Sequence, residues 1–341
     1  MTATHDILLR VDGLHTVFAT DDANVRAVNG ISFAIERGKT FALVGESGCG
    51  KSVTALSILQ LLPPAGRIDA GTIQLNNEPL TDMPEREMRA VRGGRIGMIF
   101  QEPMTSLNPV FTCGAQIIEA IRLHRQCSAR DAKQQTTELL DRVGIADPAQ
   151  RMREYPHQLS GGMRQRVMIA MALSCQPEMV IADEPTTALD VTIQAQILDL
   201  MRAIQRERQL TVLLITHDLA VVAEMADTVG VMYAGTMAEL TDVTQLFATP
   251  RHPYTQGLFR SLVTMDETKS RLETIPGSVP HPSDLPPGCP FADRCPLADK
   301  DSRCRTHRPE LREVAPGHWC ACWQADNYDT AKATNPARTD S

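Results

Sequence analysis

The stretch GESGCGKS at residues 45–52 constrains the fold of this chain more than any other. It fits the pattern Gly-x4-Gly-Lys-Ser, it follows the strand-like run TFALV, and the helical pattern KSVTALSILQLL continues from it. A strand, a glycine-rich loop and a helix in this order are typical of a phosphate-binding loop. The glycines let successive backbone N–H groups point at one anion, and the helix N-terminus adds a partial positive charge.

The polar side chains of such a loop have expected tasks. We expect the Lys51 ammonium to reach the β- and γ-phosphates of a nucleotide and the Ser52 hydroxyl to ligate Mg²⁺. The sequence therefore predicts a nucleoside triphosphate site. Its expected binding residues are Gly45, Glu46, Ser47, Gly48, Cys49, Gly50, Lys51, Ser52 and Val53.

Other polar residues come directly after apolar, strand-like runs. In MVIADEP, Asp183 and Glu184 follow the apolar residues MVIA, and in LLITHD, His217 follows the strand-like residues LLIT. Ligands of open parallel sheets bind beyond the carboxyl ends of the strands. Asp183 there suits a Mg²⁺ role, Glu184 could polarise an attacking water, and His217 could hydrogen-bond a γ-phosphate oxygen or that water. The residues alone leave other readings open, namely two solvated acids and a structural or helix-capping histidine.

A second glycine-rich stretch, LSGGMRQR, spans residues 159–166 and precedes the apolar run VMIAMAL. Ser160 is a good N-cap residue, and Gly161 and Gly162 keep side chains away from the mouth of the helix. The stretch is either a second anion-binding helix N-terminus or an ordinary capped helix.

The pattern along the chain indicates an α/β fold. Strand-like runs before residue 45 and at 93–102, and the runs that hold Asp183 and His217, alternate with helical patterns. This order predicts a mostly parallel sheet that helices cover on both faces. Residues from about 110 to 158 are strand-poor and helical, which indicates a helical insertion. After residue 247 prolines become frequent, so we expect only short elements there.

Composition limits the class of protein. The chain has 341 residues, of which 43% are hydrophobic and 22% charged, as in a globular protein. Its net charge of -7 argues against a general nucleic-acid binder. We see no apolar run long enough to span a membrane and no signal peptide near the start. We therefore expect a cytosolic protein, or one that docks on a membrane through another protein.

Five motifs together resemble the nucleotide-binding subunit of ABC transporters over roughly residues 5–250. They are GESGCGKS, Gln101 in IFQEP, LSGGMRQR, IADEPTTALD and THD. The resemblance implies a P-loop NTPase fold of the ABC cassette type. This fold has a mostly parallel sheet core, an antiparallel β subdomain, and an α-helical subdomain at about 102–160. It also implies that the chain is an ATP hydrolase that uses Mg²⁺.

The resemblance also assigns roles to single residues. Gln101 should touch Mg²⁺ or the attacking water. Ser160, Gly161 and Gly162 should contact the ATP held by a second ATPase subunit, so that two subunits enclose two nucleotides. Asp190 should couple the two sites. Glu184, Gln101 and His217 are the expected catalytic residues. The adenine-stacking residue stays open between Phe18 and Arg26.

The C-terminal third narrows the resemblance. The stretches QEPMTSLNP, TPRHPYTQGL and PPGCPFADRCP resemble the ATPase subunits of dipeptide, oligopeptide and nickel importers. This implies an ABC domain at 1–250, a C-terminal extension at 251–323 and a disordered tail at 324–341. The implied partners are a second ATPase subunit, often a paralogue, two transmembrane permease subunits and an extracytoplasmic binding protein. The chain would sit on the cytoplasmic face of a bacterial inner membrane.

Five of the nine cysteines lie between residues 289 and 322. In a reducing compartment such clustering favours metal or cluster ligation over disulfides. The resemblance implies a [4Fe–4S] cluster, with zinc as the alternative. Its ligands would be Cys289, Cys295, Cys304 and Cys322, with Cys320 as a possible substitute.

Two other functions stay open from the sequence. A soluble ABC ATPase that acts on nucleic acid would usually carry two cassettes or a long coiled-coil insertion, and we see neither. A metal- or redox-sensing ATPase would show activity that responds strongly to the state of the cysteine cluster.

Overall fold

The computed structural model describes residues 6–20, 24–187, 189–261 and 275–326. The chain divides into two compact units. The first consists of residues 1–9, 35–40 and 75–215, and the second of residues 10–34, 41–74 and 216–341. The predicted boundaries near residues 250 and 323 follow the resemblance and stay predictions. The predicted disorder of 324–341 falls largely on residues 327–341, which lie outside the described part.

Three parallel strands lie at the centre of the first unit. They are β6 (Ile96–Ile99), β7 (Met179–Asp183) and β8 (Thr211–Thr216), and β7 pairs with both of the others. Every residue of β7 and β8 is buried. Fully buried apolar strands are typical of parallel sheets that helices cover on both faces. The strands predicted at MVIADEP and LTVLLITHD are confirmed.

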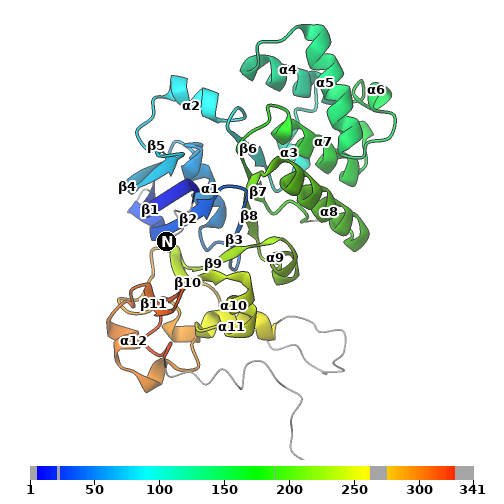
Figure 1. Cartoon of the computed structure of the whole chain (residues 1–341). Helices are drawn as coiled ribbons and strands as arrows, with labels where there is room; N and C mark the ends of the chain where they lie inside the picture. Colours follow the sequence, from blue (N-terminus) through cyan, green and yellow to red (C-terminus); the bar gives the residue numbers. More distant parts are fainter. Residues whose placement is uncertain (1–5, 21–23, 188, 262–274, 327–341) are drawn as a thin grey trace, which may run out of the picture. The chain divides into compact units, whose positions relative to one another are not determined.

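The helices of the first unit are α2 (Glu85–Val91), α3 (Pro103–Ser106), α4 (Cys113–His124), α5 (Ala129–Arg142), α6 (Pro148–Arg151), α7 (Gly161–Leu173) and α8 (Val191–Arg208). Apart from α2 and α3, they lie in stretches that the sequence predicted to be helical, and Figure 1 shows the helices in place. Helices α4 and α5 pack on each other and on α7. Ser128 begins α5 with a capping box: its hydroxyl accepts from the Asp131 N–H, and the Asp131 carboxylate accepts from the Ser128 N–H. The stretch from 113 to 151 is therefore helical, as predicted, with side-chain caps at the start of α4 and α5. That it forms a separate inserted subdomain stays a prediction.

The second unit contains two groups of strands. In one group β2, β1 and β4 are hydrogen-bonded in that order, and in the other the order is β11, β12, β10, β9 and β3. Their bounds are β1 (Ile7–Ala19), β2 (Asn24–Glu36), β3 (Thr40–Val44), β4 (Gly66–Leu75), β9 (Thr228–Tyr233), β10 (Thr236–Asp242), β11 (Arg312–Ala315) and β12 (His318–Cys320). Strands β3 and β9 are parallel, whereas β9 and β10 form an antiparallel hairpin. The hairpin turns at Ala234 and Gly235, both with positive φ as a two-residue turn of this kind requires.

The helices of the second unit are α1 (Lys51–Ile58), α9 (Leu219–Met225), α10 (Val243–Ala248), α11 (Pro253–Arg260) and α12 (Arg303–Thr306). The region after residue 247 contains short elements, as predicted. The sequence did not predict that β12 joins β10 as an antiparallel neighbour, so that this region extends the sheet. Among the described residues, we find no helix whose length and hydropathy would suit a membrane span.

Candidate functional site

The phosphate loop lies between β3 and α1, where the sequence predicted it. Gly45 and Gly50 have φ angles of 153° and 103°, which favour glycine. A Cβ atom on Gly45 would lie 2.3 Å from the Met232 carbonyl oxygen, and one on Gly50 would lie 2.6 Å from the Ala27 carbonyl oxygen. Both glycines are therefore required for the loop to pass between its neighbours.

The side chains of the loop differ in exposure. Lys51 is the first residue of α1 and is only 5% exposed. Its Nζ donates to the carbonyl oxygens of Gly45, at 2.7 Å, and Glu46, at 3.0 Å. Ser52 is exposed, whereas Cys49 is buried, and burial raises the pKa of the Cys49 thiol. The ammonium group thus lies over the curled backbone, and Cys49 is a neutral packing residue.

The acidic half of the predicted site lies in the first unit. Asp183 is the last residue of β7 and is buried, and Glu184 follows it with a φ of 48°. The Glu184 N–H donates to the Ile215 carbonyl oxygen at 2.8 Å, which fixes this left-handed turn at the end of the strand. Both carboxyl groups are therefore at the carboxyl end of a parallel strand, as predicted.

The structure brings Gln101 and Glu184 together. The Gln101 Nε2 donates to Glu184 Oε2 at 2.8 Å, and the Thr187 hydroxyl donates to the same oxygen at 2.9 Å. Sequence reasoning missed Thr187. Its position three residues after Glu184, in the run DEPTT, was the signal that could have indicated a hydroxyl within reach.

The second glycine-rich stretch forms the N-terminus of α7. Ser160 is the N-cap, and its hydroxyl accepts from the Met163 N–H at 3.3 Å. Ser160 and Gly161 are exposed, and a Cβ on Gly162 would lie 2.9 Å from Ile193 Cγ2. Predicted capping by Ser160 is confirmed. The exposed N–H groups at this helix end are of the kind that bind anions.

Asp190 and His217 each lie at the junction between two elements of secondary structure. The Asp190 carboxylate caps α8 by accepting from the Ile193 N–H at 2.9 Å. His217 is exposed and directly follows β8, and it belongs to the second unit with the phosphate loop. The capping of α9 falls to its neighbour Asp218, which accepts from the Ala220 N–H at 2.8 Å. His217 is therefore not the N-cap of α9, and its role at the γ-phosphate stays a prediction.

A buried polar cluster anchors the C-terminal region of the second unit. The Glu239 carboxylate is fully buried, and it accepts from the N–H groups of Arg251 and His252 and pairs with the His318 ring at 2.7 Å. Burial lowers the pKa of His252 to about 4, so its ring is neutral near pH 7 and Nδ1 accepts from the Tyr254 N–H. The Tyr254 hydroxyl accepts from the N–H of Glu46 at 2.8 Å. The motif His252-Pro-Tyr254 therefore reaches the phosphate loop.

Four cysteines of the C-terminal region line one small cavity, together with Trp323. They are Cys289, Cys295, Cys304 and Cys322. Burial raises the pKa of Cys289 to about 11 and that of Cys322 to about 12, so both thiols are neutral without a bound cation. Cys320 is fully buried in β12 and does not line this cavity, so it is not placed with the other four. In the described residues, no three His, Cys, Asp or Glu side chains are placed so that they could hold a metal ion.

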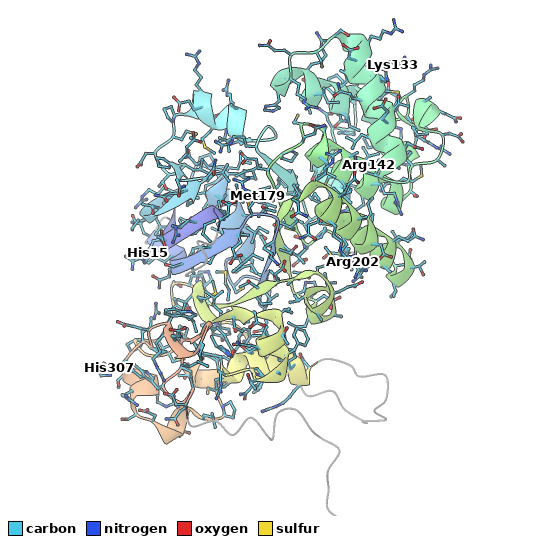
Figure 2. The ribbon with its side chains drawn as sticks, in the orientation of Figure 1. His15, Lys133, Arg142, Met179, Arg202 and His307 are labelled. Carbon is cyan, nitrogen blue, oxygen red and sulfur yellow. The ribbon has the colours of Figure 1, made fainter. Side chains whose placement is uncertain are left out.

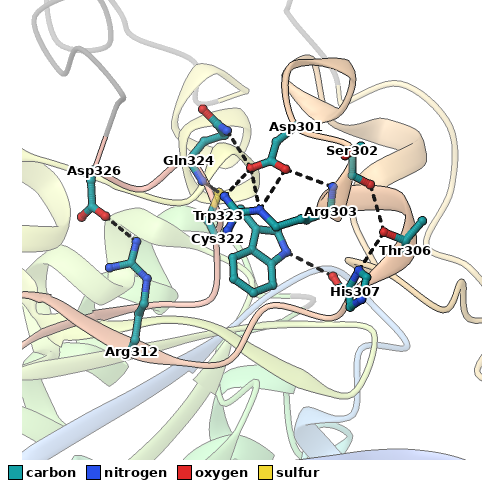
Figure 3. Close-up of polar contacts among 10 residues, drawn as sticks. All are labelled: Asp301, Ser302, Arg303, Thr306, His307, Arg312, Cys322, Trp323, Gln324 and Asp326. Atoms are coloured by element: carbon teal, nitrogen blue, oxygen red, sulfur yellow. Dashed lines mark hydrogen bonds and ion pairs between the residues drawn. The ribbon is translucent and has the colours of Figure 1, made fainter.

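Hydrogen bonds and ion pairs connect the backbone segments around these cysteines (Figure 3). The Asp301 carboxylate accepts three hydrogen bonds from the Arg303 guanidinium and one from Gln324 Nε2 at 3.2 Å. The same guanidinium lies 4.6 Å from the Trp323 ring centre, and the Trp323 N–H donates to the His307 carbonyl oxygen. The segment that carries Cys304 is thereby held against the segment that carries Cys322.

Comparisons with known proteins match most of the chain. The model of the family described as "ABC transporter" matches residues 28–187, and that of "Oligopeptide/dipeptide transporter, C-terminal region" matches residues 238–304. The dipeptide transport ATP-binding protein DppD of Bacillus subtilis is 50% identical over 94% of this chain and 95% of its own length. DppD of Escherichia coli is 49% identical over 92% of this chain and 96% of its own length.

Two solved structures resemble the fold. A dimeric, post-hydrolysis state of the ATP-binding cassette MJ0796 matches with a TM-score of 0.63, at 24% identity, over 69% of this chain and 99% of that one. CbiO1 of Clostridium perfringens matches with a TM-score of 0.61, at 28% identity, over 71% of this chain and 91% of that one. The predicted fold class is therefore confirmed.

Proposed function

This chain belongs to the family of ABC transporter ATP-binding subunits, and from that premise we propose that its ATP hydrolysis drives the import of di- or oligopeptides. The observation that carries the substrate class is the similarity over nearly the full length to peptide-transport ATP-binding proteins, which includes the C-terminal region. Nickel, the other cargo that the sequence left open, is not named for either relative. The chain would work at the cytoplasmic face of the inner membrane, as a peripheral subunit.

In this proposal the loop from Gly45 to Val53 binds the nucleotide. Its N–H groups and the N-terminus of α1 face the phosphates, and the Lys51 ammonium moves from its backbone carbonyls to the β- and γ-phosphates. The Ser52 hydroxyl, Asp183 and Gln101 would hold Mg²⁺. Their oxygen donors fit this hard cation. When bound, Mg²⁺ neutralises charge on the transferring phosphoryl group.

The catalytic proposal assigns a water-activating role to Glu184. Its carboxylate is held by Gln101 and Thr187 through one oxygen, Oε2. A carboxylate held in this way can accept a proton from a water that attacks the γ-phosphate. Gln101 would orient that water, and His217 would hydrogen-bond a γ-phosphate oxygen.

Exposed groups of the first unit support two of the proposed partner contacts. The N-terminus of α7, with Ser160, Gly161 and Gly162, would close over the ATP of a second ATPase subunit, and Asp190 would link the two sites. That subunit would be a paralogue of this chain. Met104, Val110 and Phe111 are 50%, 70% and 54% exposed, and large exposed apolar side chains favour a contact with two transmembrane permease subunits. An extracytoplasmic binding protein would deliver the peptide.

We propose that the four cysteines of the cavity hold a [4Fe–4S] cluster. What supports this is that all four line one cavity and that four thiolates are the ligands of such a cluster or of tetrahedral zinc. Because their side chains do not form a metal-binding group as placed in the described residues, ligation would require them to turn toward one another. Protein purified without oxygen should contain about four iron atoms per chain, and Cys304→Ser should lose most of them. Cys175→Ser is the matched control, because Cys175 is a buried cysteine of the other unit. One zinc per chain would replace the cluster assignment, and equal metal contents in the wild type and Cys304→Ser would contradict ligation.

The experiment for the whole function uses the assembled complex in liposomes. Peptide-loaded binding protein should raise the rate of ATP hydrolysis severalfold, since binding of the cargo favours closure of the ATPase subunits. Nickel and unloaded binding protein serve as the matched controls. A complex that responds to nickel and to no peptide would contradict the proposed cargo.

A further inference from the structure

The phosphate loop and the cysteine-bearing region are joined by an ion pair. Arg294 lies between Cys289 and Cys295, in the short helix Ala292–Arg294. Its guanidinium donates to Glu46 Oε2 at 2.7 Å and to Glu46 Oε1 at 3.0 Å. Glu46 directly follows Gly45 in the phosphate loop, so 248 positions of sequence separate the two partners.

The surroundings of Arg294 fix its position. Its side chain is 6% exposed, whereas that of Glu46 is 32% exposed. The Arg294 Nε donates to the Pro276 carbonyl oxygen at 2.8 Å, and the guanidinium carbon lies 5.7 Å from the Tyr233 ring centre. Bidentate contacts and stacking on an aromatic ring are geometries that suit arginine better than lysine. The hydrogen bonds with Glu46 raise the pKa of Arg294, so the guanidinium remains charged.

Without a partner, the negative charge of Glu46 would weaken the binding of phosphates by this loop. The loop must take up the phosphates of ATP, and a carboxylate one residue from Gly45 repels them. A bidentate arginine cancels this charge. The Tyr254 hydroxyl, which accepts from the Glu46 N–H, attaches the same residue to the C-terminal region a second time.

We propose that Arg294 is a positioning residue of the ATP site, through which the cysteine-bearing region raises the affinity of the phosphate loop for nucleotide. It does so by neutralising the charge of Glu46 beside the phosphate-binding backbone. This inference rests on the proposed binding of ATP by residues 45–53.

Nucleotide affinity should follow the net charge of the pair. The test is calorimetric titration of the full-length protein with MgATP, in wild type, Arg294→Gln, Glu46→Gln and the double variant. Arg294→Gln leaves a lone carboxylate and should weaken binding about tenfold. Glu46→Gln leaves a lone guanidinium and should tighten binding about threefold, and the double variant should return to within about threefold of wild type. The loss in Arg294→Gln should shrink in 1 M salt, because salt screens the repulsion.

A structural role for Arg294 predicts a different pattern. The contacts of Arg294 with Pro276 and Tyr233 are absent from both the single Arg294 variant and the double variant, so both would then bind equally poorly. That result, or a loss that salt does not change, overturns the proposal. Arg294→Lys keeps the positive charge but loses the bidentate contact, so its affinity should lie between those of wild type and Arg294→Gln. Lys51→Met distinguishes a failure of the Arg294 inference from a failure of the proposed ATP site. Equal MgATP binding by Lys51→Met and wild type would contradict the proposed ATP site itself.

Discussion

Replacing Glu184 with glutamine should lower the rate of ATP hydrolysis by the assembled complex by roughly 100- to 1,000-fold, with binding of MgATP retained. The amide keeps an oxygen that can accept from Gln101 Nε2 and the Thr187 hydroxyl, so the local hydrogen bonds survive. It has no basic oxygen to take a proton from water. Steady-state phosphate release, measured beside MgATP binding, separates the loss of turnover from a loss of affinity.

The matched control for this variant is Glu178→Gln. Glu178 lies just before the other end of β7, where its carboxylate pairs with Arg95 at 3.0 Å and Arg37 at 3.2 Å. The same substitution there should leave turnover within about twofold of wild type, because this partly exposed carboxylate pairs with two arginines and takes no part in the proposed chemistry. Full turnover by Glu184→Gln would remove Glu184 from the role of water-activating base.

Replacing Lys51 with methionine should weaken MgATP binding by at least about 30-fold and should abolish measurable turnover. Methionine can fill the buried space of the lysine stem, so the packing of α1 is kept. The lost group is the ammonium, which now bonds the Gly45 and Glu46 carbonyl oxygens and is expected to bond the phosphates. Calorimetric titration with MgATP gives the affinity.

Lys133→Met is the control for the lost positive charge. Lys133 is exposed on α5, in the helical part of the first unit (Figure 2). Its replacement should change the affinity less than twofold. If Lys51→Met bound MgATP as tightly as Lys133→Met, the phosphate loop would not be the nucleotide site.

The sequence predicted the parts of the site that depend on local order. The loop with Lys51 follows from a strand, glycines and a helix in sequence, and Ser160 is the N-cap that its position before α7 indicates. The position of Glu184 at the end of β7 follows from a buried apolar run, since such runs form parallel strands. These features need only neighbouring residues, so periodicity and capping rules were sufficient.

The features that sequence reasoning missed depend on contacts between distant residues. Arg294 meets Glu46 across 248 positions, and Tyr254 meets the Glu46 N–H across 208 positions. Strand β12 has three residues, too few to show a pattern, and its pairing with β10 sets its place. No spacing rule contains this information.

The most direct test of the whole account is the uptake of a labelled dipeptide by liposomes that contain the complete complex. ATP is supplied on the side of the membrane that this subunit faces. The account predicts that the complex with the wild-type chain accumulates the dipeptide only when ATP is present. It also predicts that the complex with Glu184→Gln binds ATP but accumulates none. Undiminished uptake with Glu184→Gln would contradict the claim that ATP hydrolysis by this chain drives peptide import.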